Sequence, residues 1–495
     1  MPRWIALALA LFAAPLPLAA QTAGIPRAAA VQPIAPPDTP VGKRLGEVLA
    51  VFATFTPAAG RGLVEKVFAP RMRDAFSMEE HLRRMGQMAG ESGGFDLFAV
   101  EVVSPTELRA TLRSRGDGRW MGMTLRTEAE PPHLLAGLGL RPGRPPEALR
   151  EPPAASPAEA AARLKTYVEG LAAADRFSGV VLVADGANVL LHEAYGEAEK
   201  SFHAPNTPDT KFNLGSMNKM FTAVAILQLM EQGRLALDDP IGKYLGAEWI
   251  RPAVGSQVQV QHLLSHTAGL GSYFTDAFMS SSRTRFRAID DYQPIVRGDS
   301  LAFAPGAQWR YSNTGFLLLG AIVEQVTGGS YYDYVRDHVF TPAGMTDTDS
   351  YAMDEVTPNL AIGYERAGEG AGGGVRWRNN ILEHVVRGGP AGGGYSTAPD
   401  LLRFAHALRE HRLLSPETTR LMTTPKPALN SPEYGFGFGF WDGGRVVGHT
   451  GGFPGISAVL QIGLDRPETV IVLSNYGQAS MPVVQKAGEL VAIGD

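Results

Sequence analysis

The sequence Leu214-Gly215-Ser216-Met217-Asn218-Lys219 leads directly into an apolar, helix-patterned run from Met220 to Met230. At the start of a helix, residues three apart share one face, so the Ser216 hydroxyl and the Lys219 amine are expected one turn apart. A serine hydroxyl needs a base within hydrogen-bond reach to act as a nucleophile, and a helix N-terminus offers N–H groups to an oxyanion. The pattern predicts a serine nucleophile activated by lysine. A serine helix cap followed by a solvated lysine is the alternative.

A second candidate group is Tyr311-Ser312-Asn313, just before the apolar helical run from Phe316 to Val326. A tyrosine on a loop ahead of a helix can direct its hydroxyl into a cleft, and the Asn313 amide can hydrogen-bond a lysine or a substrate amide. A core tyrosine followed by an asparagine helix cap is the commoner arrangement. Tyr311 and Asn313 are therefore candidates whose role depends on what surrounds Ser216.

A third candidate is His449-Thr450-Gly451-Gly452, which ends a strand-like run. Adjacent glycines let a substrate lie close along a strand edge. The N–H of Gly452 could then be a second oxyanion donor beside the N–H of Ser216. A glycine-rich hairpin with an incidental histidine is the alternative.

Taken together, these segments resemble the serine β-lactamase-related family, which includes class C β-lactamases, D-aminopeptidases, some DD-peptidases and carboxylesterases. The resemblance covers about residues 157–490 and rests on five segments in order: Ser216-Met217-Asn218-Lys219, Gln261 to Leu270, Pro305-Gly306 with Tyr311 to Gly315, Gly389 to Gly393, and His449 to Gly452. It implies Ser216 as nucleophile, Lys219 and Tyr311 as the base pair, and the Ser216 and Gly452 amides as the oxyanion hole. It implies substrate contacts from Asn313, His449, Thr450 and Gly451.

The last of these segments departs from the penicillin-active pattern. Penicillin-active relatives usually carry lysine where this chain has His449, and that charge holds a substrate carboxylate. A neutral imidazole is a poor carboxylate anchor unless its pKa is raised. The His-Thr-Gly form resembles the D-aminopeptidase and esterase branches, so we expect hydrolysis of esters or amides. A β-lactamase or DD-peptidase acting on cell-wall-like substrates, and a non-catalytic binding protein, remain the alternatives.

Strand patterns stand at both ends of the region that carries these segments, with a long helical region between them. This order predicts an antiparallel sheet with an inserted all-α region, and the resemblance implies a β-lactamase/transpeptidase-like α/β fold. The site is expected in the cleft between the two parts. The expected strands cover 178–184, 188–194, 434–441, 445–449, 456–463 and 468–475, and a closing helix begins near Met481.

A smaller α+β domain is expected before this region. Helical patterns occupy the chain up to about residue 90, and Ser77 with Glu80 makes a capping box for the third helix. Strict alternation over 107–113 and the turn Gly116-Asp117-Gly118 then indicate an antiparallel meander. A cystatin-like or NTF2-like cone would suit this order, with a packing or binding role.

The first twenty residues have the pattern of a secretory signal. Arg3 precedes an apolar run from Trp4 to Ala14, and Leu18-Ala19-Ala20 places small residues before Gln21. An uncleaved anchor helix is the alternative, which the shortness of the run disfavours. We therefore expect a periplasmic or secreted protein. The expected organisation is a signal peptide (1–20), an Ala/Pro-rich linker (21–40), the small domain (41–140), a second linker (141–156) and the hydrolase domain (157–495).

The composition of the chain limits which classes of partner and cofactor are expected. The formal net charge of -5 in 495 residues gives no reason to expect nucleic acid, and the mature chain shows no membrane span. The absence of cysteine excludes disulfides and metal–thiolate sites. His262 and His266 have the i, i+4 spacing of a metal pair but no third ligand, so we interpret them as structural. We expect no cofactor or metal and a small-molecule or peptide-like substrate, and the oligomeric state stays open.

Overall fold

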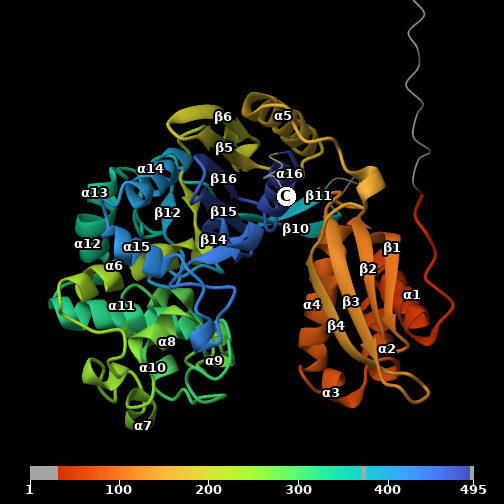
Figure 1. Ribbon diagram of the computed structural model, residues 1–495, viewed down its shortest axis with the longest axis horizontal. Helices are drawn as coiled ribbons and strands as arrows, with labels where there is room; N and C mark the ends of the chain where they lie inside the picture. The colour runs from red at the N-terminus through yellow and green to blue at the C-terminus, as the bar shows by residue number, and fades with distance from the viewer. Residues whose placement is uncertain (1–31, 370–374, 491–495) are drawn as a thin grey trace, which may run out of the picture.

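A six-stranded antiparallel sheet organises the larger part of the molecule (Figure 1), which is a computed structural model describing residues 32–369 and 375–490. The strand order is β13-β14-β15-β16-β5-β6. Two strands from the start of the hydrolase region thus join four from its end, as the sequence pattern predicts. The strands are β5 (Gly179–Asp185), β6 (Asn188–Tyr195), β13 (Gly439–Trp441), β14 (Val446–Phe453), β15 (Ile456–Gly463) and β16 (Glu468–Ser474). The expected signal peptide lies outside the described residues.

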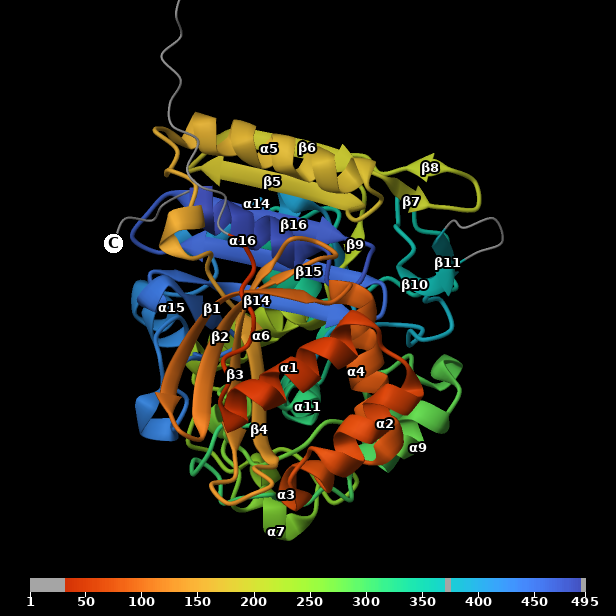
Figure 2. The same cartoon turned by 90° about the vertical axis from the view of Figure 1, so that its right-hand side faces the viewer.

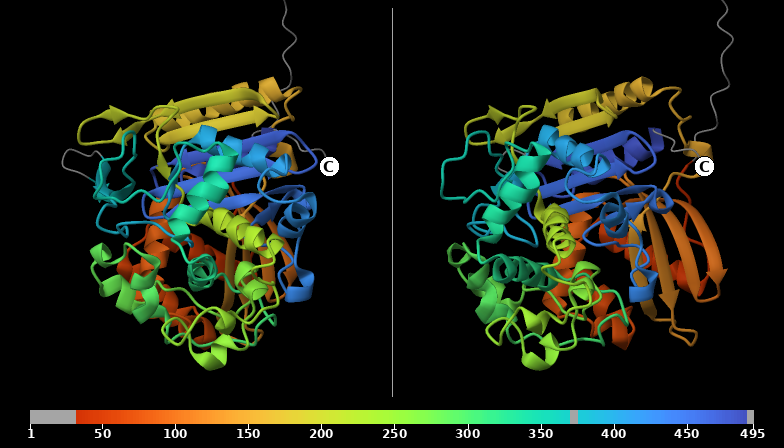
Figure 3. Two further views of the ribbon diagram at one scale, coloured as in Figure 1. Left: turned by 90° about the vertical axis from the view of Figure 1, so that its left-hand side faces the viewer. Right: turned by 60° about the vertical axis from the view of Figure 1, so that its left-hand side comes forward.

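Helices cover both faces of this sheet (Figures 1 and 3). Helices α5 (Pro157–Ala173) and α16 (Ser480–Leu490) pack on one face, where Leu164 and Val483 meet Val472 in one buried cluster. The opposite face packs against α6 (Asn218–Glu231) and α14 (Ala398–Arg409), and Leu182 and Leu460 belong to that larger cluster. Because both faces are covered, β5 is buried over six consecutive residues. Each large apolar side chain so buried contributes about 1.5–3 kcal/mol to folding.

The inserted region between the two halves of the sheet is mainly helical, as predicted. Besides α6 and α14, its α-helices are α7 (Pro252–Gly255), α8 (Val260–Leu264), α9 (Asp276–Ser280), α10 (Gln293–Val296), α11 (Asn313–Thr327), α12 (Tyr331–Val335), α13 (Thr341–Ala343) and α15 (Pro416–Met422). Short strands complete this part: β7 (Glu197–Glu199), β8 (Ala204–Pro205), β9 (Phe212–Asn213), β10 (Tyr364–Glu369), β11 (Val375–Asn379) and β12 (Tyr395–Ser396). The apolar helices α6 and α11 cross in the core below the sheet edge (Figure 1).

The expected strand over 434–441 is wrong for most of its length. Only Gly439–Trp441 is strand, and the preceding segment folds back so that the Gly435 N–H donates to the Phe438 carbonyl at 2.8 Å. Gly437 adopts φ +77°, and a Cβ there would stand 2.6 Å from the Ala223 Cβ. The alternating aromatics predicted extended backbone, but a left-handed glycine pressed against α6 imposes a turn.

The N-terminal unit has its own core. Its helices are α1 (Pro40–Ala53), α2 (Pro57–Lys66), α3 (Pro70–Arg73) and α4 (Met78–Ser92), and its strands are β1 (Phe95–Ser104), β2 (Glu107–Ser114), β3 (Trp120–Thr127) and β4 (Leu135–Pro142). The strands form an antiparallel meander, with helices α1, α2 and α4 on one side of it (Figure 2). The Ser77 hydroxyl accepts the Glu80 N–H at 3.2 Å, as the capping pattern predicts.

The N-terminal unit is joined to the sheet domain mainly through α16. The Gln485 side chain accepts the Trp120 N–H at 3.2 Å and donates to the Trp120 carbonyl at 3.0 Å. Nearby, the Tyr167 hydroxyl donates to the Asp117 carbonyl at 3.5 Å. Hydrogen bonds of Gln485 on α16 and Tyr167 on α5 therefore connect the two units. Over the part of the chain that the structure describes, no helix has the length and apolar character needed to cross a bilayer.

Candidate active site

Ser216 lies in a single 3-10 turn, η2 (Gly215–Met217), that runs into α6. The Asn213 side chain accepts the Gly215 N–H at 2.9 Å, and Gly215 adopts φ +50°. The N-cap of α6 is Met217, so the alternative in which Ser216 caps the helix is wrong. Glycine adopts this left-handed conformation readily, and the turn leaves the Ser216 side chain facing Lys219.

Lys219 is completely buried on the first turn of α6. Its Nζ lies 3.0 Å from the Ser216 Oγ and donates to the Asn313 Oδ1 at 2.9 Å and to the Ala391 carbonyl. All three partners are uncharged, and burial lowers the pKa of Lys219 well below its usual value. A neutral amine has two N–H groups for Asn313 and Ala391 and a lone pair for the Ser216 hydroxyl. The alternative of a solvated lysine is therefore wrong.

Tyr311 completes this cluster from the loop before α11. The Lys219 Nζ lies 4.9 Å from the centre of the Tyr311 ring. Burial raises the pKa of the Tyr311 phenol, and a hydrogen bond with Ser216 acts in the opposite direction. The two pKa shifts favour a neutral phenol beside a neutral amine.

The two residues that follow Tyr311 have different roles, one capping α11 and the other contacting Lys219. Ser312, not Asn313, caps α11, because its hydroxyl accepts the Gly315 N–H at 2.9 Å. Asn313 is thereby free to accept from Lys219, while its amide nitrogen donates to the Ser272 hydroxyl at 3.1 Å. Asn313 was expected to hydrogen-bond a lysine or a substrate amide, and the structure shows the contact with the lysine.

His266 contacts the loop that carries Tyr311 and Ser312. Its Nδ1 accepts the Ser312 N–H at 3.1 Å, and its ring centre lies 4.2 Å from that of Tyr311. Burial lowers the pKa of His266 well below its usual value, so the neutral ring carries its proton on Nε2. That Nε2 is buried with no hydrogen-bond partner among the described residues. His262 accepts the Gln259 N–H with its Nδ1, and no group of three metal-binding side chains gathers in the described structure.

The glycines of β14 approach the serine turn closely. A Cβ on Gly215 would stand 2.9 Å from the Gly452 nitrogen, and one on Gly451 would overlap the Leu214 carbonyl oxygen. Gly452 is exposed, with open space where a Cβ would point. The segment Gly389 to Gly393 packs against the same turn, since the Gly393 N–H donates to the Gly215 carbonyl at 3.1 Å. The Gly452 amide nitrogen thus lies beside the turn that carries Ser216.

His449 is buried and fully hydrogen-bonded within the protein. Its Nδ1 lies 2.6 Å from the Thr450 carbonyl, which can only accept, so this nitrogen carries the proton. Its Nε2 therefore accepts from the Tyr434 hydroxyl at 2.9 Å. Burial lowers the pKa of His449 to about 3, and the nearby Lys219 acts in the same direction. The neutral His449 side chain thus links Tyr434 to the Thr450 backbone. Thr450 itself is exposed.

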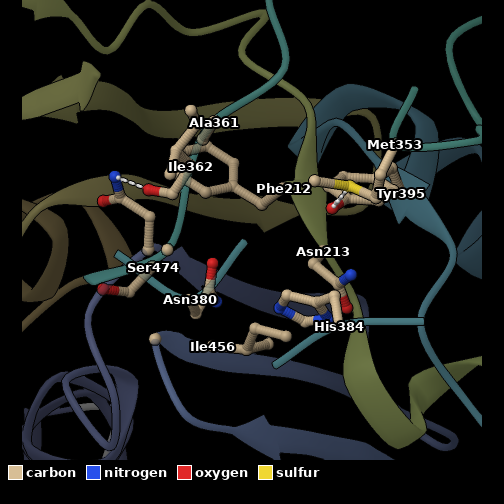
Figure 4. Close-up of a pocket in the computed structure, with 13 residues that line it drawn as sticks. Phe212, Asn213, Met353, Ala361, Ile362, Asn380, His384, Tyr395, Ile456 and Ser474 are labelled. Atoms are coloured by element: carbon tan, nitrogen blue, oxygen red, sulfur yellow. Dashed lines mark hydrogen bonds between the residues drawn. The ribbon is translucent and has the colours of Figure 1, made fainter. Parts of the chain in front are cut away.

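Two cavities flank this cluster, and only one has room for a substrate. The larger, of about 860 Å³, is lined by Tyr311, His449 and Thr450 at one end. The smaller, of about 10 Å³, lies behind the serine turn between Asn213, His384 and Tyr395 (Figure 4). It is large enough for about one water molecule. The larger cavity is therefore the candidate substrate cleft.

Three contacts of this site were missed by the sequence reasoning. Asn213 fixes the serine turn, Tyr434 orients His449, and the Ala391 carbonyl binds Lys219. Asn213 stands beside the serine motif, and its short polar side chain is typical of a turn. The contact of Ala391 could not be predicted from its residue type, because it is made by the backbone carbonyl, which every residue has.

Comparisons with known proteins show the family of this chain. A family model described as Beta-lactamase matches residues 164–492. The chain is 32% identical over 358 residues to Penicillin-binding protein 4* of Bacillus subtilis (67% of this chain, 76% of that protein). It is 31% identical over 314 residues to Esterase EstB of Burkholderia gladioli (57% and 79%). A D-stereospecific amidohydrolase from Streptomyces sp. superposes with a TM-score of 0.56 at 26% identity, covering 68% of this chain and 99% of that one. The chain therefore belongs to the β-lactamase family of serine hydrolases, whose members act through a serine acyl-enzyme.

Proposed function

We propose that this protein hydrolyses esters or amides through an acyl-enzyme on Ser216, as an esterase or a D-aminopeptidase-like amidase. The observation that carries the proposal is the Lys219 amine, buried among uncharged partners 3.0 Å from the Ser216 hydroxyl. Burial lowers the pKa of Lys219 and so favours the neutral amine, which is the form that acts as a base, and a base at this distance activates the serine.

Acylation begins when Lys219 takes the Ser216 proton and Oγ attacks the substrate carbonyl. The backbone amides of Ser216 and Gly452 receive the developing oxyanion. Tyr311 shares this proton with Lys219 and delivers it to the leaving oxygen or nitrogen as the carbonyl bond to that atom breaks. Lys219 and Tyr311 titrate as one unit in this scheme.

Deacylation uses the same groups in reverse. A water molecule gives a proton to the Lys219–Tyr311 pair and adds its oxygen to the acyl carbonyl. The bond between that carbonyl and Ser216 Oγ then breaks, and Oγ regains its proton. Asn313 keeps the amine in place throughout, because its Oδ1 accepts a hydrogen bond from the Lys219 Nζ at 2.9 Å.

The state of His449 favours esters and amides over substrates held by a terminal carboxylate. The position that carries a charged lysine in penicillin-active relatives holds here a neutral imidazole with both nitrogens engaged. Exposed Thr450 and the glycine edge of β14 are left to contact the substrate. The cleft therefore lacks a fixed positive charge at this point.

A β-lactamase or DD-peptidase activity is the second candidate, and the similarity to Penicillin-binding protein 4* favours it. Turnover of nitrocefin, or a stable adduct with a labelled penicillin at Ser216, would support this candidate. Rapid hydrolysis of p-nitrophenyl esters and D-amino-acid amides without either result supports the first.

The proposal is tested by trapping the intermediate. A fluorophosphonate probe should add to Ser216, and mass spectrometry of the peptide that contains it locates the adduct. Labelling at another residue, or none in a folded preparation, would contradict the proposal and favour a binding protein on the same fold. Glu417→Gln, on the exposed start of α15, serves as a matched control that should label like the wild type.

Export belongs to the same proposal. The basic and apolar pattern of residues 1–20 supports secretion to a periplasm or beyond. N-terminal sequencing of protein recovered outside the cytoplasm should begin near Gln21. A mature chain that keeps Met1 would contradict it.

A further inference from the structure

The candidate substrate cleft is walled by aromatic rings. Beyond Tyr311, its lining residues include Trp309, Tyr434, Phe440 and Trp441. Trp309 is 45% exposed, so much of this large aromatic residue is open to solvent. Aromatic faces carry negative charge density and attract cations, quaternary ammonium groups above all.

The charge of the lining has one sign. Glu433 and Asp442 are the charged side chains among the residues that line the cleft, and the only histidine there is the neutral His449. Glu433 is exposed and forms no ion pair within the described part of the chain. Asp442 pairs with Arg445 at 2.7 Å through one carboxylate oxygen, while its other oxygen is buried without a hydrogen bond in the described structure. An aromatic cleft with an unpaired carboxylate at its wall is complementary to a positively charged group.

The cleft extends from the group that protonates the leaving atom. Tyr311 lines it, whereas Ser216 and Gly452 do not. In the proposed mechanism the leaving group departs past the Tyr311 hydroxyl, so this cleft receives the leaving group and not the acyl chain. Resting on that proposed function, we propose that the cleft selects esters and amides whose leaving group carries a cationic, alkylated ammonium or amine. Glu433 and Trp441 are the specificity-determining residues.

The reaction balances without any further reactant. With a choline-type thioester, Ser216 Oγ forms a bond to the acyl carbon while the bond between that carbon and sulfur breaks. The sulfur leaves as the thiol after receiving the proton that Ser216 gave to the Lys219–Tyr311 pair. Water then releases the acid. The cationic group is not altered, so it affects binding and the rate of acylation only.

The test compares two isosteric substrates, acetylthiocholine and S-(3,3-dimethylbutyl) thioacetate, which differ in one charged nitrogen. Thiol release is followed with Ellman's reagent, and the enzyme adds no background because the chain has no cysteine. Each kcat/KM is divided by the rate of alkaline hydrolysis of the same ester. We expect the corrected ratio to favour the cation by about tenfold, since cation–π and ion-pair contacts each contribute a few-fold.

Two variants assign the preference to the cleft. Glu433→Gln should lower the ratio about 3- to 5-fold, the effect of one exposed ion pair, and added salt should lower the wild-type ratio toward the same value. Trp441→Leu should lower it by a similar factor. Glu417→Gln removes an equal charge from a nearby exposed helix and should leave the ratio unchanged.

The outcomes separate the two proposals. Equal corrected turnover of both thioesters by the wild type overturns the inference and leaves the serine hydrolase mechanism intact. So does a ratio that falls equally in Glu433→Gln and Glu417→Gln, because the preference would then come from net charge. Failure to turn over either thioester, together with failure of the fluorophosphonate to label Ser216, overturns the proposed function itself.

Discussion

Two buried lysines, Lys219 on α6 and Lys426 in the loop after α15, show what separates a base from a structural cation. Each approaches an aromatic ring, Tyr311 at 4.9 Å and Phe436 at 4.6 Å. Each also has its pKa lowered by burial, that of Lys426 to about 8. Burial and a lowered pKa are therefore common to both.

The difference lies in the partners. Lys426 donates to the carbonyls of Leu421 at 2.6 Å and Thr424 at 2.5 Å and to the Thr424 hydroxyl at 3.1 Å. Carbonyls can only accept, so this site suits an ammonium with three N–H groups. Lys219 instead faces the Ser216 hydroxyl, which can donate to a neutral amine. A base needs a nucleophile whose proton it can take, and for Lys219 the Ser216 hydroxyl is the candidate at 3.0 Å.

The largest expected effect is from Ser216→Ala. Removing the nucleophile should lower kcat about 10³-fold or more, because only binding and the oxyanion amides remain. Steady-state hydrolysis of p-nitrophenyl acetate measures it, with circular dichroism to show that the fold is kept. Wild-type turnover by the folded variant would make the assignment of Ser216 wrong.

Lys219→Ala should be nearly as severe and should not add to the loss from Ser216→Ala, since the two act as one unit. In the wild type, kcat/KM should rise with pH as Lys219 loses its proton, with a midpoint below the usual lysine pKa because burial lowers it. A pH series from 5 to 9 on a neutral ester tests this. A profile in Lys219→Ala with the same acid limb would assign that limb to another group.

His266→Phe should have an intermediate effect. It keeps the ring against Tyr311 but removes the acceptor for the Ser312 N–H, so Tyr311 and Asn313 lose part of their positioning. We expect kcat to fall about tenfold with little change in KM, because a buried N–H left without a partner costs about 1–3 kcal/mol. Partial recovery in His266→Gln, which restores an acceptor, would separate positioning from loss of stability.

Lys426→Met should have the smallest effect on activity, with kcat/KM close to the wild-type value. Its effect should appear in stability. The folded pKa is depressed to about 8 from a usual 10.5, so between these values the unfolded state binds more protons and wild-type stability rises with pH. Urea unfolding at pH 8 and pH 10 should show this rise in the wild type and its loss in Lys426→Met. A large loss of kcat in a stable variant would erase the distinction between the two lysines.

The local signals in the sequence predicted the serine, lysine and tyrosine positions and most of the sheet. Strand β5, for example, is a continuous apolar run up to its last residue, and its burial follows from composition. The segment 434–441 was mispredicted because its aromatics alternate as in a strand, while the turn depends on contact between Gly437 and α6. The capping of α11 by Ser312 was likewise decided by geometry, since both Ser312 and Asn313 can cap a helix.

By itself the sequence determined the candidate nucleophile and base, because residue types and short spacings decide which groups can take those roles. It also determined the order of sheet, helical insertion and sheet. Only the tertiary structure decided the protonation of these groups. Lys219 meets the Ala391 carbonyl and Asn313 across 172 and 94 residues, and burial among such uncharged partners lowers its pKa and favours the neutral amine. In the same way burial lowers the pKa of His449 and keeps its ring neutral, because a pKa depends on what surrounds a group in space.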